Sequence, residues 1–166
     1  MISGRRDVIP LFILAFLLFL GQRSSEAAEK ITIGPVEEVI LLPWGIKLLA
    51  RIDTGAATTS LGAKNLEIKG NIAEFDVREE YGGTHLKLPI VEWRGFVNAG
   101  GHELRPVVEM EICIASKRLR TQVNLNDRSG VAFPLLIGRR VLQGNFIVDV
   151  SRQVRVANHC PEEPSR

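Results

Sequence analysis

The sequence has few cysteines, few aromatic residues and no excess of either charge. Its 166 residues include two cysteines, aromatic residues make up 6%, and 21 basic residues stand against 19 acidic ones. Two cysteines exclude a disulfide-dense miniprotein and cannot form a cysteine-based zinc site by themselves. The near balance of charge argues against a dedicated nucleic-acid binder, which normally carries an excess of basic residues.

Long hydrophobic runs are also lacking. The apolar segment Val8–Leu20 is shorter than the roughly 20 residues that a transmembrane helix needs. It follows a pair of arginines and precedes small residues, an order that is typical of a signal peptide. We therefore expect residues 1–27 to form a signal peptide that is cleaved between Ala27 and Ala28 and directs export to the periplasm. The alternative is an uncleaved N-terminal anchor, and only in that form would the protein contact a membrane.

The rest of the chain contains short segments in which apolar and polar residues alternate, the pattern of half-buried strands. The clearest pair, Val108–Ile114 and Leu119–Leu125, is separated by a polar turn and predicts a β-hairpin. Further strands are expected at Lys47–Asp53, Ala73–Arg78, Thr84–Val91, Phe146–Val150 and Gln153–Val156. The single expected helix covers Arg139–Gln143 and is ended by Gly144.

These elements predict the fold class. Strands at this spacing without long helices between them indicate an all-β barrel or sandwich. A content of 45% hydrophobic and 24% charged residues is typical of a globular domain. We expect that domain at residues 28–157, followed by a polar tail at 158–166. Cys113 lies in a predicted strand and Cys160 in the tail, so whether the two form a disulfide stays open.

The segment Ala50–Ser60 carries a motif whose residue types suit a chemical reaction as well as packing. An apolar strand leads into Asp53, and Gly55 then permits a tight turn and the close approach of another main chain. The hydroxyl of Thr54 can hold such a turn. A carboxylate at a strand end, surrounded by hydroxyls and main-chain amides, is placed to activate a water molecule. The alternative interpretation is an aspartate that initiates an ordinary turn between strands.

A second motif follows later in the chain. In the segment Phe133–Leu142 an apolar strand, a glycine and an arginine precede the short helix. Together with the Asp-Thr-Gly-Ala sequence of residues 53–56, this order resembles the retropepsin-like aspartic peptidases, in which an apolar-apolar-Gly-Arg segment packs beneath the catalytic loop. More narrowly, the chain is similar to a bacterial family often described as ATP-dependent zinc proteases, some of whose members are linked to ATP-grasp ligases. The segments that carry this closer resemblance are Ala50–Ala56, Arg105–Val108, Asn126–Ser129, Pro134–Arg140 and Phe146–Val150.

The resemblance covers about residues 33–151, and it implies both a fold and a set of site residues. The fold is a small closed β-barrel of the retropepsin-like (acid protease) type with one short helix. Asp53 is implied as the catalytic residue. The residues implied to support its loop are Thr54, Gly55, Ala56, Gly138 and Arg139. Gly138 would permit close packing behind the loop, and Arg139 would pair with a carboxylate. Gly130–Phe133 departs from the methionine and tyrosine that the family usually has there.

Aspartic peptidases need two aspartates close enough to share one proton, because like charges at that distance cannot both ionise. The chain has one Asp-Thr-Gly, and removal of 27 residues from 166 leaves 139, too few for a two-lobed enzyme that carries both aspartates. The resemblance therefore implies a homodimer in which each copy contributes Asp53. Asp149 lacks a following Thr-Gly and is expected to have a structural role. Asp127 is expected to lie in a turn or an ion pair.

Three functions stay open: an exported aspartic endopeptidase that acts on peptides or envelope proteins, a non-catalytic cell-envelope binding module on the same fold, and a zinc-dependent peptidase. Against the third, the sequence has no His-Glu-x-x-His motif and no phosphate-binding loop, and His85, His102 and His159 lack ligand spacing. We therefore expect no metal, no other cofactor and no nucleic-acid partner. The tip of a flap-like hairpin is expected at Gly82-Gly83 or at Gly100-Gly101.

Overall fold

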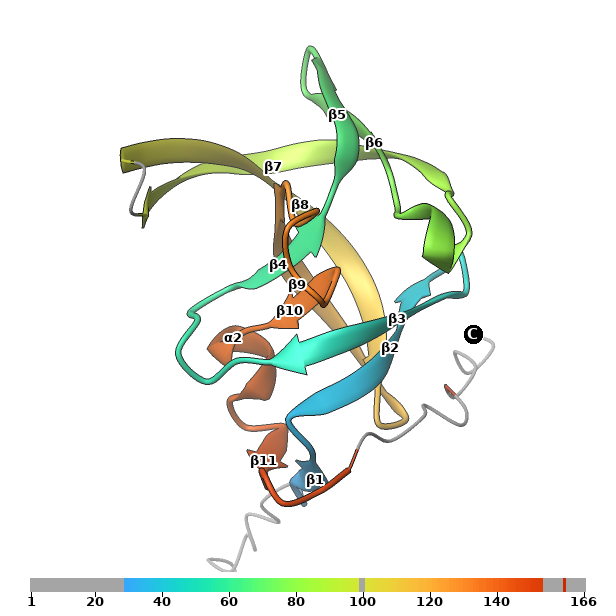
Figure 1. Ribbon diagram of the computed structural model, residues 1–166, viewed down its shortest axis with the longest axis vertical. Helices are drawn as coiled ribbons and strands as arrows, with labels where there is room; N and C mark the ends of the chain where they lie inside the picture. The colour runs from blue at the N-terminus through green and yellow to red at the C-terminus, as the bar shows by residue number, and fades with distance from the viewer. Residues whose placement is uncertain (1–28, 99–100, 154–159, 161–166) are drawn as a thin grey trace, which may run out of the picture.

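The computed structural model describes residues 29–98, 101–153 and 160 (Figure 1). The described part consists mainly of strands and confirms the predicted all-β class. The strands are β1 (Ile31–Ile33), β2 (Val36–Leu42), β3 (Ile46–Ile52), β4 (Thr59–Gly62), β5 (Lys64–Lys69), β6 (Ile72–Asp76), β7 (His85–Asn98), β8 (Gly101–Ile114), β9 (Lys117–Asn126), β10 (Leu135–Ile137) and β11 (Phe146–Val148). Two short helices, η2 (Glu79–Tyr81) and α2 (Arg139–Leu142), complete the described elements.

Six of these strands form a closed ring in the order β2-β3-β10-β4-β9-β8, which is closed by pairing of β8 with β2. The sequence of β3 shows why the ring has an apolar interior. Residues at alternate positions from Ile46 to Ile52 are buried, whereas Lys47, Leu49 and Arg51 between them are exposed. This two-residue period places one face of each strand in the core. The packing of β3 therefore fixes the position of its last residue and of Asp53, which follows it.

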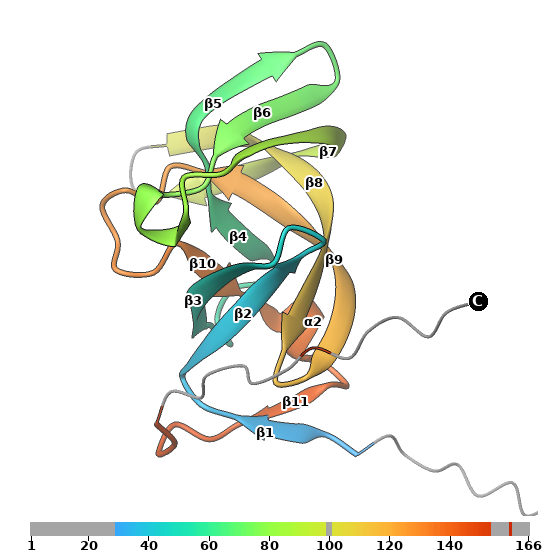
Figure 2. The ribbon, with the colours of Figure 1, turned by 90° about the vertical axis from the view of Figure 1, so that its right-hand side faces the viewer.

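Strands β7, β6 and β5 extend the sheet away from the ring, and β7 and β8 form a long arm (Figures 1 and 2). The predicted strand Thr84–Val91 is too short, because β7 continues to Asn98 and pairs residue by residue with β8 from Trp93 onward. The outer half of the arm lies beyond the ring, so its apolar side chains face solvent, as the 76% exposure of Val97 shows. Apolar alternation is thus a poor guide to where this strand ends.

The predicted hairpin of β8 and β9 is confirmed, with Ile114 paired to Lys117. Its two turn residues, Ala115 and Ser116, both have positive φ angles of 48° and 66°. That conformation belongs to the tight two-residue turns whose twist matches the flanking strands. The hairpin supplies two neighbouring strands of the ring and brings Asn124 and Asn126 toward β4.

Other predicted boundaries differ from those observed. The helix ends at Leu142, since Gln143 is already extended. The strand expected at Phe146–Val150 ends at Val148, because the Asp149 carboxylate accepts the main-chain N–H of Ser151 at 3.0 Å and begins a turn. Strands β1, β2, β4 and β5 were not predicted. Residues 1–27, the tail apart from Cys160, and all but Gln153 of the strand expected at Gln153–Val156 lie outside the described residues.

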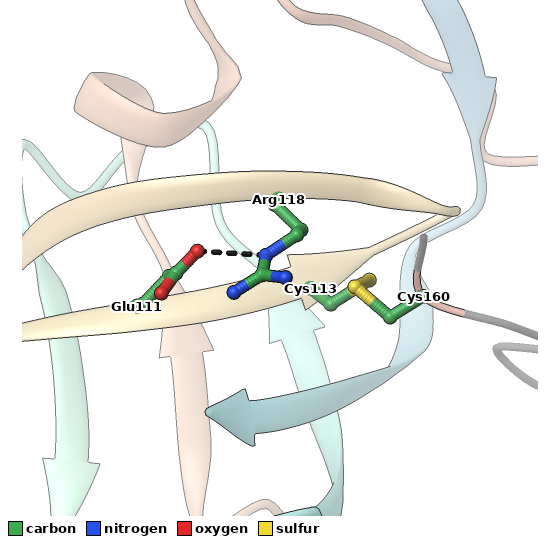
Figure 3. The surroundings of a disulfide bond; sticks show 4 residues. All are labelled: Glu111, Cys113, Arg118 and Cys160. Atoms are coloured by element: carbon green, nitrogen blue, oxygen red, sulfur yellow. Dashed lines mark hydrogen bonds and ion pairs between the residues drawn. A yellow bond between two sulfur atoms is a disulfide. The ribbon is translucent and has the colours of Figure 1, made fainter. Parts of the chain in front are cut away.

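A disulfide joins Cys113 on β8 to Cys160, with Cα atoms 6.0 Å apart, which settles the open question of their pairing (Figure 3). Cys113 is completely buried beside the ion pair of Arg118 and Glu111. The bond ties Cys160 to the wall of the ring. Among the described residues, no helix combines the length and apolar character needed to cross a membrane.

Candidate active site

The loop that follows β3 orients the carboxylate of Asp53. The Asp53 main-chain N–H donates to the carbonyl of Ile137 on β10 at 2.9 Å, which continues the pairing of the two strands by one residue. One carboxylate oxygen, Oδ1, accepts the N–H groups of Gly55 at 2.9 Å and Ala56 at 3.0 Å. A Cβ at position 55 would lie 3.2 Å from that oxygen. The turn is therefore built around the partly buried carboxylate, which it fixes in one direction.

The junction of β10 and α2 supports the back of this loop. A Cβ on Gly138 would lie 2.5 to 2.8 Å from three main-chain atoms of Thr58, so only glycine fits there. The N–H of Arg139 donates to the Ala56 carbonyl at 2.9 Å, and the Gly138 N–H lies 3.4 Å from the hydroxyl of Thr59. Main-chain N–H groups in the first turn of α2 thus donate to main-chain carbonyls of the loop. These bonds join the two segments.

Arg139 contacts carbonyls instead of the carboxylate that the sequence predicted. Its Nη1 donates to the main-chain oxygens of Thr54 at 3.0 Å and Gly55 at 2.6 Å. The expected pairing was wrong because the Asp53 carboxylate accepts the loop N–H groups, while the Thr54 and Gly55 carbonyls face α2 and accept from Arg139. Exposed Thr54 and Arg139 also border a cavity of about 480 Å³ whose other walls include Phe146 and Val148 of β11.

A second cavity, of about 350 Å³, lies between the Asp53 loop and the base of the β7–β8 arm. Its lining residues are Ala56, Ala57, Thr58, Ser60, Phe96, Arg105, Asn124, Arg128 and Leu136. The Arg105 guanidinium stacks over the Phe96 ring at 4.6 Å from its centroid. Two buried polar atoms in the lining, Ser60 Oγ and Asn124 Oδ1, have no hydrogen-bond partner. We call this space the arginine cavity.

The unpartnered atoms belong to buried side chains. Asn124 is 2% exposed and donates through Nδ2 to the carbonyl of Thr59 at 2.7 Å, which leaves its acceptor oxygen unused. Ser60 is 6% exposed. Because a buried polar group without a partner costs free energy, such atoms mark a place where a ligand or water completes the bonding.

Arg128 brings positive charge close to Asp53. Burial lowers the pKa of the half-buried Arg128 guanidinium, and the positive charges of Arg78 and Arg105 act in the same direction, whereas the charge of Asp53 opposes them. Arginine stays charged in proteins despite such shifts. The carboxylate of Asp53 therefore has a cationic neighbourhood, which favours anionic groups in the adjoining cavity.

The other aspartates considered in the sequence form hydrogen bonds of their own and none of those bonds is to Asp53. Asp127 accepts the N–H of Ser129 at 2.8 Å, which confirms the predicted turn, and these hydrogen bonds lower the pKa of its carboxyl. Asp149 lies in the turn after β11, and hydrogen bonds from Ser151 likewise lower its pKa. Asp76, at the end of β6, accepts from Asn65 and pairs with His85.

The glycine pairs and histidines singled out in the sequence lie in different parts of the fold. Gly101 lies at the tip of the β7–β8 arm, whose base borders the arginine cavity, whereas Gly82-Gly83 follows η2. His102 is on β8, and His159 lies outside the described residues. Within residues 29–98, 101–153 and 160, no three His, Cys, Asp or Glu side chains are grouped to hold a metal ion.

Sequence reasoning missed the arginine cavity. Arg105 and Arg128 both occur in segments that carried the family resemblance, Arg105–Val108 and Asn126–Ser129, but neither residue was given a role. The presence of an arginine in each segment was the available signal. Their convergence was not visible in the sequence, because it depends on the pairing of β7 with β8 and of β4 with β9.

Comparisons with known proteins agree with this geometry. Residues 32–158 match a family described as RimB-like, the retropepsin-like aspartic endopeptidase RimB. Two curated relatives carry the name "Probable alpha-L-glutamate ligase". The one from Parasynechococcus marenigrum (strain WH8102) is 28% identical over 73% of this chain, and the one from Desulfotalea psychrophila (strain LSv54) is 27% identical over 78%. The chain spans only 28% and 30% of the length of these relatives.

A solved structure is similar as well. It is the crystal structure of a Legionella pneumophila protein of unknown function, with a TM-score of 0.65 and 29% sequence identity. The similarity covers 76% of this chain and 98% of that protein. The family match includes both motifs of the candidate site, the Asp53 loop and the Gly138–Arg139 junction.

Proposed function

Because the chain belongs to the RimB-like family of retropepsin-like aspartic endopeptidases, we propose that it hydrolyses peptide bonds with Asp53 as its catalytic residue. The observation that carries the proposal is the carboxylate of Asp53, fixed at a strand end by two main-chain N–H groups, in a loop whose residues Ala56–Thr58 border the arginine cavity. Thr54, Gly55, Ala56, Gly138 and Arg139 have supporting roles, since each contacts the loop or forms part of it.

The proposed enzyme is a homodimer. Catalysis by aspartates needs two carboxylates that share a proton, and the described chain offers one such loop, since Asp127 and Asp149 are each engaged in turns. A two-fold axis beside exposed Thr54 would bring a second Asp53 into place. The neighbouring cavity of about 480 Å³ and the 53% exposed Ile147 on β11 supply a partly apolar surface for that contact.

In the proposed reaction, one Asp53 carboxyl is ionised and the other is protonated. The ionised group accepts a proton from a water molecule, whose oxygen adds to the carbonyl carbon of the peptide bond, while the protonated group donates its proton to the carbonyl oxygen. The resulting diol then loses one hydroxyl proton to the newly ionised carboxylate. As the C–N bond breaks, the nitrogen takes the proton held by the first carboxyl and leaves as an amine.

The proposed substrate is a peptide with acidic side chains. Arg105 and Arg128 line the cavity beside the Asp53 loop. Arg105 is already paired with the Glu103 carboxylate at 2.7 Å, so Arg128 is the guanidinium proposed to bind a substrate carboxylate. A substrate main-chain N–H would satisfy the unpartnered Asn124 oxygen. The names of the two glutamate ligase relatives are consistent with glutamate as the acidic residue.

We also propose export to the periplasm. The arginine pair, apolar segment and small residues of the N-terminal 27 residues support it. The disulfide between Cys113 and Cys160 supports it too, because such bonds persist mainly in oxidising compartments.

The test compares two peptides that differ only in having glutamate or glutamine side chains, with cleavage followed by mass spectrometry. The wild-type protein is expected to cleave the glutamate peptide faster, and Asp53→Asn is expected to fold normally and cleave neither. Unchanged cleavage by Asp53→Asn would remove Asp53 from the reaction. Binding without cleavage by the wild-type protein would instead establish a non-catalytic binding module on this fold.

A further inference from the structure

The loop that carries Arg128, residues 127–134, is held by main-chain bonds at its two ends. The N–H of Ala63 donates to the carbonyl of Asn126 at 3.0 Å, and the N–H of Gly62 donates to that of Pro134 at 2.7 Å. The donors are the last residue of β4 and the residue that follows it. Between these points the loop pairs with no strand, so its conformation depends on other contacts.

Arg78, which precedes η2, makes those contacts from a distant part of the sequence. Its Nη2 donates to the main-chain carbonyls of Arg128 and Val131, the latter at 2.9 Å. The Arg78 side chain is only 17% exposed, and its other terminal nitrogen lies 3.3 Å from the Glu80 carboxylate. One guanidinium thus adds two donors to the centre of the loop, where the N–H of Val131 also donates to the Arg128 carbonyl at 3.2 Å.

The same contacts determine where the Arg128 side chain points. The positive charge of Arg78 attracts the Arg128 carbonyl but repels its guanidinium. The Arg128 stem packs against Gly62, where a Cβ would lie 3.3 Å from the Cβ of Arg128, and its Nε donates to the Phe133 carbonyl at 3.2 Å. The packed stem and the bond to the Phe133 carbonyl fix the course of the side chain, which lines the arginine cavity, and the bond from Arg78 holds the main chain from which it starts.

We infer that Arg78 is a positioning residue that holds Arg128 in place to bind acidic substrates. This inference rests on the proposed function for its substrate class, but its structural part concerns the loop alone. Removal of Arg78 would leave the Val131 carbonyl without its donor and the Arg128 carbonyl with only the N–H of Val131, at 3.2 Å. The loop centre would be held less firmly, so Arg128 would no longer be pre-organised. Because a single nitrogen makes both contacts, a lysine ammonium at position 78 can replace them in part.

The test uses full-length protein in the Asp53→Asn form, so that peptides bind without being cleaved. Binding of the glutamate and glutamine peptides is measured for Arg78→Ala, Arg78→Lys, Arg128→Ala and the Arg78→Ala/Arg128→Ala double variant. We expect Arg78→Ala to weaken binding of the glutamate peptide about tenfold, with substantial recovery in Arg78→Lys. In the Arg128→Ala background the same change should have little further effect, because the two residues act through one contact.

Two results would overturn the inference. One is an equal loss of affinity from Arg78→Ala with and without Arg128, and the other is an equal loss for both peptides. Arg120→Ala is the matched control, because its side chain is 78% exposed and pairs with Glu109 on the surface. It should leave binding unchanged.

Hydrogen exchange of the peptide-free protein separates this inference from the proposed function. Arg78→Ala should increase exchange in residues 127–133 and leave residues 53–58 protected, whatever the substrate is. If the wild-type protein binds neither peptide, the proposed substrate class fails while the exchange result still decides the role of Arg78. Unchanged exchange in the loop would contradict that role directly.

Discussion

The two loops that border the arginine cavity are held in different ways. Residues 53–58 are fixed by main-chain hydrogen bonds and by Gly138, at which any side chain would collide with Thr58. Residues 127–134 are fixed at the centre largely by side chains, since Arg78 donates to the carbonyls of Arg128 and Val131 and Arg128 Nε donates to that of Phe133, in addition to one main-chain bond from Val131 to Arg128. The first loop is thus determined by the backbone, whereas the second can change through substitution at a few positions. In the proposed enzyme, the first loop would carry the chemistry and the second the recognition of substrate.

The departure of Gly130–Phe133 from the family pattern falls in the second loop. A departure from the family sequence is expected in this loop and not in the first, since a segment held by side chains can change its sequence without loss of the fold. The Asp53 loop matches the family pattern throughout residues 50–56. A change in substrate preference is therefore expected to arise in the second loop.

The largest expected effect comes from a region that touches neither loop. Replacing both cysteines, as Cys113→Ser with Cys160→Ser, removes a bond across a separation of 47 residues. The free energy of unfolding should fall by about 4 kcal/mol, because the unfolded chain regains that loop's conformational freedom. Denaturant unfolding measures it. Peptide affinity under folding conditions should stay the same, and a change in affinity would mean that the disulfide also shapes the loops.

Gly138→Ala should have the next largest effect. The added methyl group would lie within 2.8 Å of main-chain atoms, so the Asp53 loop or α2 must move. We expect a loss of about 3 kcal/mol in the free energy of unfolding and a fall in kcat. Gly130→Ala is the control in the second loop, because nothing lies within 4 Å of a Cβ at that position. Equal effects of the two substitutions would contradict the difference between the loops.

Arg139→Ala should have a smaller effect on stability, about 1 kcal/mol, because its two bonds to the Thr54 and Gly55 carbonyls are exposed. It should lower kcat and leave KM nearly unchanged, since the carboxylate loop loses support while the arginine cavity stays intact. Arg78→Ala should do the opposite and raise KM. Steady-state kinetics of the two variants on the glutamate peptide makes the comparison. If both variants changed kcat and KM in the same way, the loops would not act separately.

The smallest expected effect is on pH dependence. Hydrogen bonds from Ser129 lower the pKa of Asp127, so folding favours its ionised form. That contribution is present above the ordinary pKa of 3.8 and is lost as the pH falls through the lower value in the folded protein. The amide NMR signal of Ser129 should therefore titrate below pH 3.8. The amide of Ser151, bonded to Asp149, supplies the matched comparison outside the loop. A midpoint above 3.8 would contradict the hydrogen bond.

Local features of the fold were predictable from the sequence, and features that depend on distant contacts were not. The β8–β9 hairpin follows from alternation on both sides of a short turn. The Asp53 loop and its neighbour Gly138 followed from two motifs and a family resemblance. The partner of Arg139 could not be predicted, because the direction of the Thr54 and Gly55 carbonyls is set by packing of the loop against α2.

The outer half of β7 and the arginine cavity show the same limit. Burial alternates along residues 91–97, but the exposed positions there include the apolar residues Val91, Trp93 and Val97, so apolar side chains do not mark a buried face in the arm. Arg105 and Arg128 meet only after two strand pairings have formed. Arg78 is 50 residues from the carbonyl that it binds, a separation over which sequence pattern carries no signal.

The central claim, that Asp53 of two copies forms one active site, is tested most directly by a mixed dimer. Wild-type and Asp53→Asn chains with different tags are combined, the heterodimer is purified through both tags, and its kcat on the glutamate peptide is measured. A shared site predicts a loss of at least about 10³-fold in the heterodimer, because one catalytic carboxylate is missing. A heterodimer that retains half of the wild-type kcat would show that each chain works alone, and would contradict the account.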